Sequence, residues 1–220
     1  LRYKFFPSNN FEISAIHGKQ RNGFEYSSSV ITGINSELNL SEFLNSKNID
    51  IVFGASLVNR YQNINSGFNM PENVTVSGAR FDLFYNKFYA NIELAKKGND
   101  VIANNEEILS ERKYDGTAIQ IDLGYSQKGL GINTSFRRLE NFNLYSDKLA
   151  EGNIYNQKTI SFTPALTKQQ DYLLTNIYVY NSQPRLVIGD IEKRVGEVGF
   201  QNDIYYSFKN ESFDAITIGF

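Results

Sequence analysis

The 220-residue chain contains no cysteine, no tryptophan, one methionine and one histidine. Without cysteine the chain has neither a disulfide framework nor a thiolate metal site. The absence of cysteine does not identify the cellular compartment of the protein. No run approaches the ~18 consecutive apolar residues of a membrane helix. The first residues, LRYKFF, do not form a signal peptide. They are typical of a strand already under way, so we expect a trimmed chain whose beginning lies elsewhere.

Charge of one sign is also lacking, since 22 basic and 24 acidic residues are interspersed and the formal net charge is −2. The chain therefore lacks the clustered basic residues that are typical of nucleic-acid-binding proteins. Aromatic residues are abundant instead, with 17 Phe and 14 Tyr beside 16 Gly. This composition favours β structure with turns. Few windows carry the apolar period of a helix, and we interpret residues 1–220 as a single all-β domain.

The clearest pattern is a hairpin between Val74 and Lys97, folded about a two-residue turn at 86–87. Its expected cross-strand pairs are apolar on one face and polar, with opposite charges, on the other. The pairs are Tyr85–Phe88, Leu83–Ala90, Phe81–Ile92 and Ala79–Leu94 against Asp82–Asn91 and Arg80–Glu93. A second hairpin, with its turn at 127–128, sets Tyr125 against Leu130 and Asp122 against Asn133.

Similar alternation elsewhere predicts about twelve strands, including short ones at 160–162 and 175–180. Short connections are expected at 7–10, 41–48, 86–87, 127–128, 164–171 and 209–212. Long polar loops fall between them, and the longest irregular stretch is expected at 98–115. Tight turns alternating with long loops are typical of an antiparallel up-and-down transmembrane β-barrel, which a soluble Greek-key sandwich does not imitate. We therefore predict an outer-membrane barrel that contacts lipid.

Several short motifs carry a family resemblance: HGKQR at 17–21, SELNL at 36–40, TPALTKQ at 163–169, LTNIYVY at 174–180 and NDIYY at 202–206. Together they resemble an uncharacterised group of Bacteroidota proteins, a domain of unknown function expected to be outer-membrane β-barrels. The resemblance implies the location and the architecture, and it provides no catalytic residues. It also implies a longer amino end, so further strands or a plug are expected outside this chain, which is then a fragment of a larger barrel.

The best functional candidates are the polar side chains expected to face the lumen. They are Glu37, Asn39, Arg80, Asp82, Asn91, Glu93, Gln120, Asp122, Asn133 and Arg137. A water-filled lumen requires polar groups, and mixed charge gives weak ion preference. The alternative is that these residues form a salt-bridged filling of a closed barrel.

Two functions therefore stay open. One is a porin-like channel or transporter for small polar solutes. The other is a non-conducting barrel that acts as scaffold or partner in an outer-membrane complex for secretion or export. A soluble β-sandwich that binds glycans is a third reading.

No enzyme chemistry and no cofactor are expected. His17 is the only histidine, and although Ser14 is close in sequence, no nucleophile motif accompanies it. The acidic stretch from Asn99 to Glu107 contains oxygen ligands that calcium prefers, but it lacks the spacing of a calcium loop, so we expect a solvated loop and no metal.

The last strand poses a question of register. Ile216, Ile218 and Phe220 alternate up to a terminal aromatic residue. A simple turn at 209–212 pairs Phe208 with Phe213 and places these residues inside the barrel. A one-residue bulge exchanges the faces and places them outside, and we favour the bulge.

Overall fold

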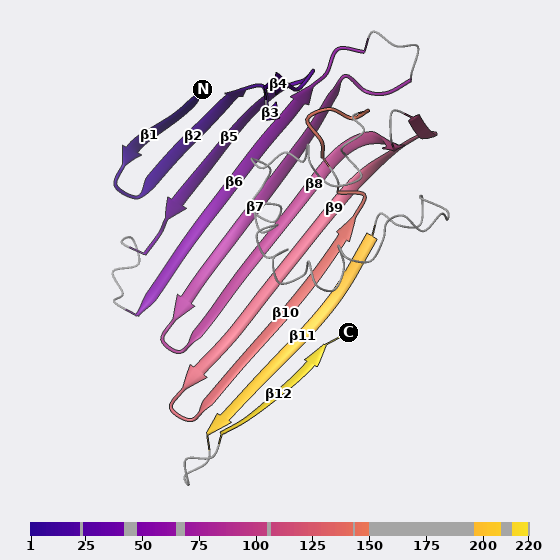
Figure 1. Ribbon diagram of the computed structural model, residues 1–220. Helices are drawn as coiled ribbons and strands as arrows, with labels where there is room; N and C mark the ends of the chain where they lie inside the picture. The colour runs from indigo at the N-terminus through magenta and orange to yellow at the C-terminus, as the bar shows by residue number, and fades with distance from the viewer. Residues whose placement is uncertain are drawn as a thin grey trace.

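The computed structural model describes residues 1–22, 24–41, 48–64, 69–104, 107–142, 144–149, 196–207 and 213–219. Its strands are β1 (Arg2–Ser8), β2 (Phe11–Gly18), β3 (Arg21–Asn22), β4 (Glu25–Tyr26), β5 (Val30–Asn39), β6 (Ile49–Tyr61), β7 (Asn73–Tyr85), β8 (Phe88–Asn104), β9 (Glu107–Gln127), β10 (Leu130–Glu140), β11 (Gly196–Ser207) and β12 (Phe213–Gly219). Ten strands form one sheet in the order β1-β2-β5-β6-β7-β8-β9-β10-β11-β12 (Figure 1). Strands β3 and β4 form a separate ribbon.

The sheet is antiparallel and up-and-down, as the alternation predicts. Tight turns join β1 to β2, β7 to β8 and β9 to β10 at one end, which we call the turn end (Figure 1). Longer connections follow β2, β6 and β10 at the opposite end, the loop end. Strand β10 pairs directly with β11, and strands were also predicted at 160–162 and 175–180. Those two predictions lie outside the described residues.

The register of the β7–β8 hairpin is the predicted one, and Asn86 adopts a positive φ of 54° in its turn. The predicted register of the β9–β10 hairpin is wrong by two residues. Leu130 pairs with Gln127, and the turn falls at Lys128-Gly129, where Gly129 has a φ of 83°. Glycine reaches this conformation without steric cost, which explains why the turn moves onto it. A slip of two residues leaves every side chain on its predicted face.

The irregular stretch expected at 98–115 is instead a continuation of β8 and β9, which run for 17 and 21 residues. The ladder has register shifts after Lys97 and on both sides of Ile102. Cross-strand hydrogen bonds satisfy the backbone there despite the polar sequence, so composition alone is a poor guide to strand ends.

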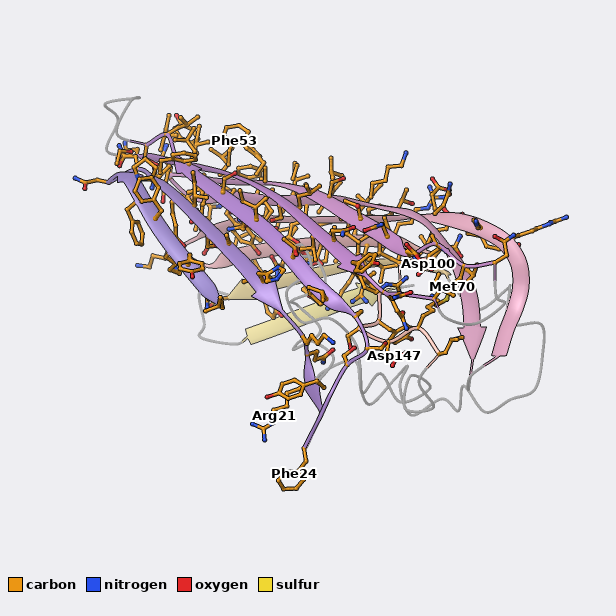
Figure 2. The ribbon with its side chains drawn as sticks, turned by 90° about the horizontal axis from the view of Figure 1, so that it is seen from above. Arg21, Phe24, Phe53, Met70, Asp100 and Asp147 are labelled. Atoms are coloured by element: carbon orange, nitrogen blue, oxygen red, sulfur yellow. The ribbon has the colours of Figure 1, made fainter. Side chains whose placement is uncertain are left out.

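One face of the sheet is apolar and uncovered within the described part of the chain. Phe53, Phe81, Ile92, Ile121 and Phe136 stand in one cross-strand row of this apolar face. The rings of Phe53 and Phe81 lie 5.0 Å apart. The exposed fraction is 44% for Phe53, 47% for Leu57, 50% for Leu94 and 68% for Val198. Figure 2 shows Phe53 on this side, with Asp100 and Asp147 on the opposite side.

The apolar face has polar and aromatic borders. Toward the loop end it stops at a polar row in which His17 Nδ1 lies 2.9 Å from Thr32 Oγ1, and Thr75 Oγ1 donates to Asn59 Oδ1 over 3.0 Å. Toward the turn end it stops at aromatic residues that pair across the ladder, Tyr85, Phe88 and Tyr125. The nine residues of β7 from 77 to 85 rise about 30 Å, of which a tilt of about 40° leaves about 23 Å.

The opposite face, which we call the polar face, changes character along its length. Near the loop end it carries a buried apolar cluster that includes Val58, Val74, Val76 and Ala118. Toward the turn end polar side chains replace it. This apolar half is a correction to the expectation that polar residues occupy the whole face.

The sheet is open in the described residues, because β1 pairs only with β2 and β12 only with β11. Within this part of the chain no helix is long and apolar enough to cross a membrane. Ser207 pairs with Phe213, and Ile216 stands opposite Ile204. This is the register that the predicted bulge requires, one residue away from the simple-turn pairing.

Candidate functional site on the polar face

All ten residues predicted to face a lumen lie on described strands and share the polar face. The ladder pairs Glu37 with Gly54, Gly54 with Arg80, Arg80 with Glu93, Glu93 with Gln120 and Gln120 with Arg137. A second row holds Asn39, Asp82, Asn91 and Asp122, and Asn133 stands in a third. Six neighbouring strands thus bring together residues that are up to 100 positions apart.

Arg80 crosses a whole strand to reach its partners. Its guanidinium lies over Gly54 on β6, where an added Cβ would come within 2.4 Å of Nη2. From there Nη1 donates to Asn35 Oδ1 over 2.9 Å and to Ser56 Oγ over 3.2 Å, and Nη2 lies 3.3 Å from Glu37 Oε2. The absence of a side chain at position 54 therefore allows this bridge between β7 and β5.

Tyr89 makes a second crossing of the same kind. Its ring lies over Gly124 on β9, where an added Cβ would come within 1.9 Å of Cε1. The hydroxyl donates to Asn133 Oδ1 on β10, and the ring stacks with Phe84 at 6.1 Å. Two glycines thus allow side chains to link strands that do not neighbour each other.

The remaining predicted residues form shorter hydrogen bonds. Asn91 donates to Asp82, and Gln120 Nε2 donates to Asp122 Oδ2 over 2.7 Å. Asp122 also accepts from Ser135 Oγ over 2.5 Å. The carboxylates Asp82 and Asp122 are therefore each held by hydrogen bonds to side chains of the same or the neighbouring strand, which fixes their positions.

A segment after β10 folds back over the polar face near the loop end. We call residues 141–142 and 144–149 the strap. Phe142 and Leu144 are buried in the apolar cluster of Val58, Val74 and Val76. The strap begins by crossing β9 closely, since the carbonyl oxygen of Asn141 lies 2.4 Å from where a Cβ on Gly116 would be.

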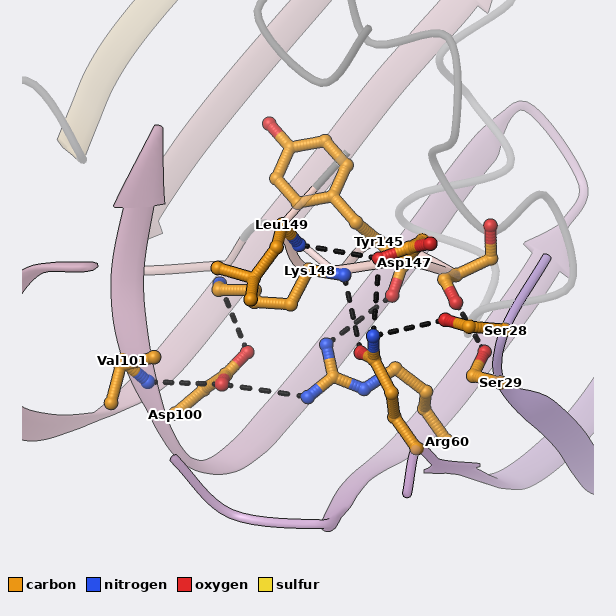
Figure 3. Close-up of polar contacts among 11 residues, drawn as sticks. Ser28, Ser29, Arg60, Asp100, Val101, Tyr145, Asp147, Lys148 and Leu149 are labelled. Carbon is orange, nitrogen blue, oxygen red and sulfur yellow. Dashed lines mark hydrogen bonds and ion pairs between the residues drawn. The ribbon is translucent and has the colours of Figure 1, made fainter. Parts of the chain in front are cut away.

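Hydrogen bonds fasten the strap to β6 and to the residues just before β5. The carbonyl oxygen of Ser146 accepts from Ser27 Oγ over 2.5 Å and from Ser29 Oγ. Gln62 Nε2 donates to Asp147 Oδ1 over 3.1 Å, and its Oε1 accepts from the Lys148 amide over 3.2 Å. The strap therefore reaches from β10 across the sheet to the start of β5 (Figure 3).

A buried ion cluster lies beneath the strap, beyond the border of the apolar face. Asp100 Oδ2 lies 3.0 Å from Lys148 Nζ, and its Oδ1 lies 3.5 Å from Arg60 Nη2 (Figure 3). Arg60 Nη1 also donates to the carbonyl oxygen of Tyr145 over 3.3 Å. Arg60 and Asp100 are fully buried, so one carboxylate joins a sheet cation to a strap cation.

The pKa values in this cluster follow from burial and from an excess of cations. Burial lowers the pKa of Lys97 to about 7, and the charges of Lys148 and Arg60 add to this against the pull of Asp100. Burial also lowers the pKa of Lys148 more than Asp100 raises it. Burial alone would raise the pKa of Asp100, but Lys148, Arg60 and Lys97 outweigh it and hold that pKa below its usual range.

The strap and the ion cluster were not predicted from the sequence. The register of the β7–β8 hairpin does place Lys97 on the same face as Glu93, which is a usable signal. Asp100 was wrongly expected in a solvated loop, since it is buried and pairs with Arg60 and Lys148. In the described residues no three acidic or histidine side chains converge as a metal site requires. Ser14 and His17 lie on opposite faces of β2, so they form no pair.

The fold and the polar face define the class of this protein: an all-β protein built on one antiparallel up-and-down sheet. Residues 1–216 match the model of a family of unknown function, DUF6029, and the chain belongs to this family. None of the curated proteins compared with the chain matches it.

Proposed function

We propose that this chain is an outer-membrane β-barrel protein of bacteria, in which the apolar face meets lipid, the polar face lines the lumen and the strap closes the lumen at the loop end. In this closed form it does not conduct. It serves as a scaffold or partner subunit of an outer-membrane complex for secretion or export. The resemblance to Bacteroidota barrels is consistent with this location.

The uncovered apolar face carries the membrane part of the proposal. Soluble monomers rarely leave an apolar patch of more than a few hundred Å² exposed. A glycan-binding β-sandwich would bury such a face against a second sheet at about 10 Å, and in the described residues only the small β3–β4 ribbon lies outside the main sheet. The length of the apolar face, about 23 Å after tilt, matches the lipid-facing band of about 25 Å in outer-membrane barrels.

The strap carries the scaffold part. Phe142 and Leu144 bury apolar surface on the side that would face the lumen. The carbonyl oxygen of Ser146 accepts hydrogen bonds from Ser27 and Ser29, just before β5. A dry core across the lumen opposes the passage of water and ions. A porin-like channel for small polar solutes is the second candidate, and the observation that favours it is the set of hydrogen-bonded polar side chains on this face, among them Arg80, Asp82 and Asp122.

Lipid contact can be tested at single positions because the chain contains no cysteine. A fluorophore is attached to F53C, in the middle of the apolar face, and to T75C, in the polar row of the same face. Each variant is reconstituted in vesicles with brominated lipids. We expect quenching at position 53 and little at position 75. Equal quenching at both positions, or recovery of the chain without detergent, contradicts the membrane assignment.

Conductance separates the two candidate functions. The wild-type chain is purified in detergent, checked for heat-modifiable migration on a gel, and inserted into planar bilayers. Silence together with co-purifying membrane subunits supports the scaffold, whereas a stable single-channel step in the wild type supports the channel and refutes the closed form.

A further inference from the structure

The strap is held by burial of two apolar side chains, by hydrogen bonds to Ser27, Ser29 and Gln62, and by ion pairs around one carboxylate. Asp100 lies 3.0 Å from Lys148 Nζ on the strap and 3.5 Å from Arg60 Nη2 on β6. Lys97 lies on the same strand as Asp100, β8, and contributes a third basic side chain. Asp100 is the acid common to these three cations. Without it, the positive charge of Lys148 would face Arg60 and Lys97 in a low-dielectric site, and like charges there repel strongly.

The rest of the strap is held by two buried apolar side chains, Phe142 and Leu144, and by hydrogen bonds to residues outside the strap. Its carbonyl oxygen at Ser146 is held by the hydroxyl groups of Ser27 and Ser29, which water can replace. By contrast, β6 and β7 beneath the strap are paired along both strands, and β7 pairs with β8 from Val76 to Tyr85, so the strap can detach while the sheet stays intact.

We infer that the strap is a releasable closure fastened by Asp100, and that its release converts the closed barrel into a pore for small cations. This inference rests on the proposed barrel and extends it, since the scaffold and channel readings become two states of one molecule.

The solute class follows from the side chains that an open lumen would present toward the turn end. On the polar face of β5 to β11 this half carries six described carboxylates and two guanidinium groups: Glu37, Asp50, Asp82, Glu93, Asp122 and Asp203 with Arg80 and Arg137. An excess of acids in this half attracts cations and repels anions, whereas Arg60 and Lys97 add positive charge at the loop end.

The first experiment measures openings in planar bilayers for D100N, which keeps the size of the side chain and removes its charge. We expect no openings from wild type and repeated openings from D100N. The matched control is D115N, which makes the same change at an exposed carboxylate on β9. We expect D115N to stay silent.

A second variant tests the inference without depending on the folding of D100N, because removal of a buried charge partner is destabilising. S27A/S29A removes both donors to the Ser146 carbonyl oxygen and leaves the ion cluster in place. We expect brief openings, with a reversal potential in a KCl gradient on the potassium side. An anion-side potential overturns the assigned solute class.

A reversible lock shows whether the strap itself is the closure. S29C/S146C joined by a short thiol cross-linker in the D100N background should abolish openings, and cleavage of the linker should restore them. Openings that persist in the locked form overturn the inference. The inference is also overturned if D100N and S27A/S29A both stay silent although their preparations show heat-modifiable migration and lipid quenching at position 53. Loss of those two signals in the wild type refutes the barrel itself, so the two failures are distinguishable.

Discussion

Substitution of Gly124 by alanine should be among the most destabilising changes of a single methyl group on the polar face. The added Cβ would lie 1.9 Å from Cε1, 2.4 Å from Cζ and 2.6 Å from Cδ1 of Tyr89. Three ring atoms are involved, so the whole ring has to leave its position. It then loses its hydrogen bond to Asn133 and its stacking on Phe84.

The magnitude follows from these losses. Overpacking costs about 1–3 kcal/mol, and loss of a partly buried hydrogen bond adds about 1 kcal/mol. We therefore expect G124A to lower the free energy of unfolding by about 2–4 kcal/mol. The control is G131A on the next strand, where an added Cβ would meet only Tyr205 at 3.7 Å, an ordinary contact distance. We expect a change of less than about 0.5 kcal/mol there.

The assay is urea unfolding in detergent micelles, followed by heat-modifiable migration, on wild type, G124A, Y89A and the double variant. If the ring is the obstacle, alanine at position 124 should cost almost nothing once Tyr89 is alanine, and the coupling energy should be about 2 kcal/mol or more. Equal stability of G124A and G131A would refute the reasoning. Additive effects of Y89A and G124A would refute it as well.

Three further outcomes are expected. Lys97 has a folded-state pKa of about 7, below its unfolded value, so its charge lowers the stability of the fold most below pH 7, and this loss fades as pH rises toward 10.5. The free energy of unfolding of the wild type should therefore be about 2 kcal/mol higher at pH 9 than at pH 7. The K97M variant should lose most of this difference. R80K cannot reproduce the fork that binds Asn35, Ser56 and Glu37 and should lose about 1–2 kcal/mol, whereas R138K, whose ion pair is half exposed, should lose less than about 0.5 kcal/mol in the same assay. F53R places a charge on the apolar face and should reduce insertion into vesicles by about 2–4 kcal/mol, measured by flotation, and unchanged insertion would count against lipid contact.

The family match covers almost the whole chain and names no function, so the physical chemistry of the two faces carries the functional argument. In the proposed function, the apolar face is the surface that meets lipid, and the strap is the segment that keeps a face lined with carboxylates from conducting. The choice between channel and scaffold then depends on the position of the strap.

The sequence by itself determined most of the described strands, their two faces and the up-and-down order, but not the continuation of β8 and β9 through the stretch expected to be irregular. Side chains alternate with a period of two, so Phe81 and Ile92 were separable from Arg80 and Glu93 without coordinates, and all ten predicted residues share the polar face. The same local rule tolerates a slip of two residues, which is why the β9–β10 turn was misplaced while its faces were correct.

Only the tertiary structure decided what lies over the polar face. The approach of Lys148 to Asp100, and of Tyr89 to Asn133, joins positions about 45 residues apart, and no periodicity encodes such pairs. The crossings over Gly54 and Gly124 likewise depend on which residue stands opposite each glycine in the ladder. Strand patterns follow from local side-chain alternation, whereas the strap and its ion cluster follow from long-range packing that only the assembled sheet brings about.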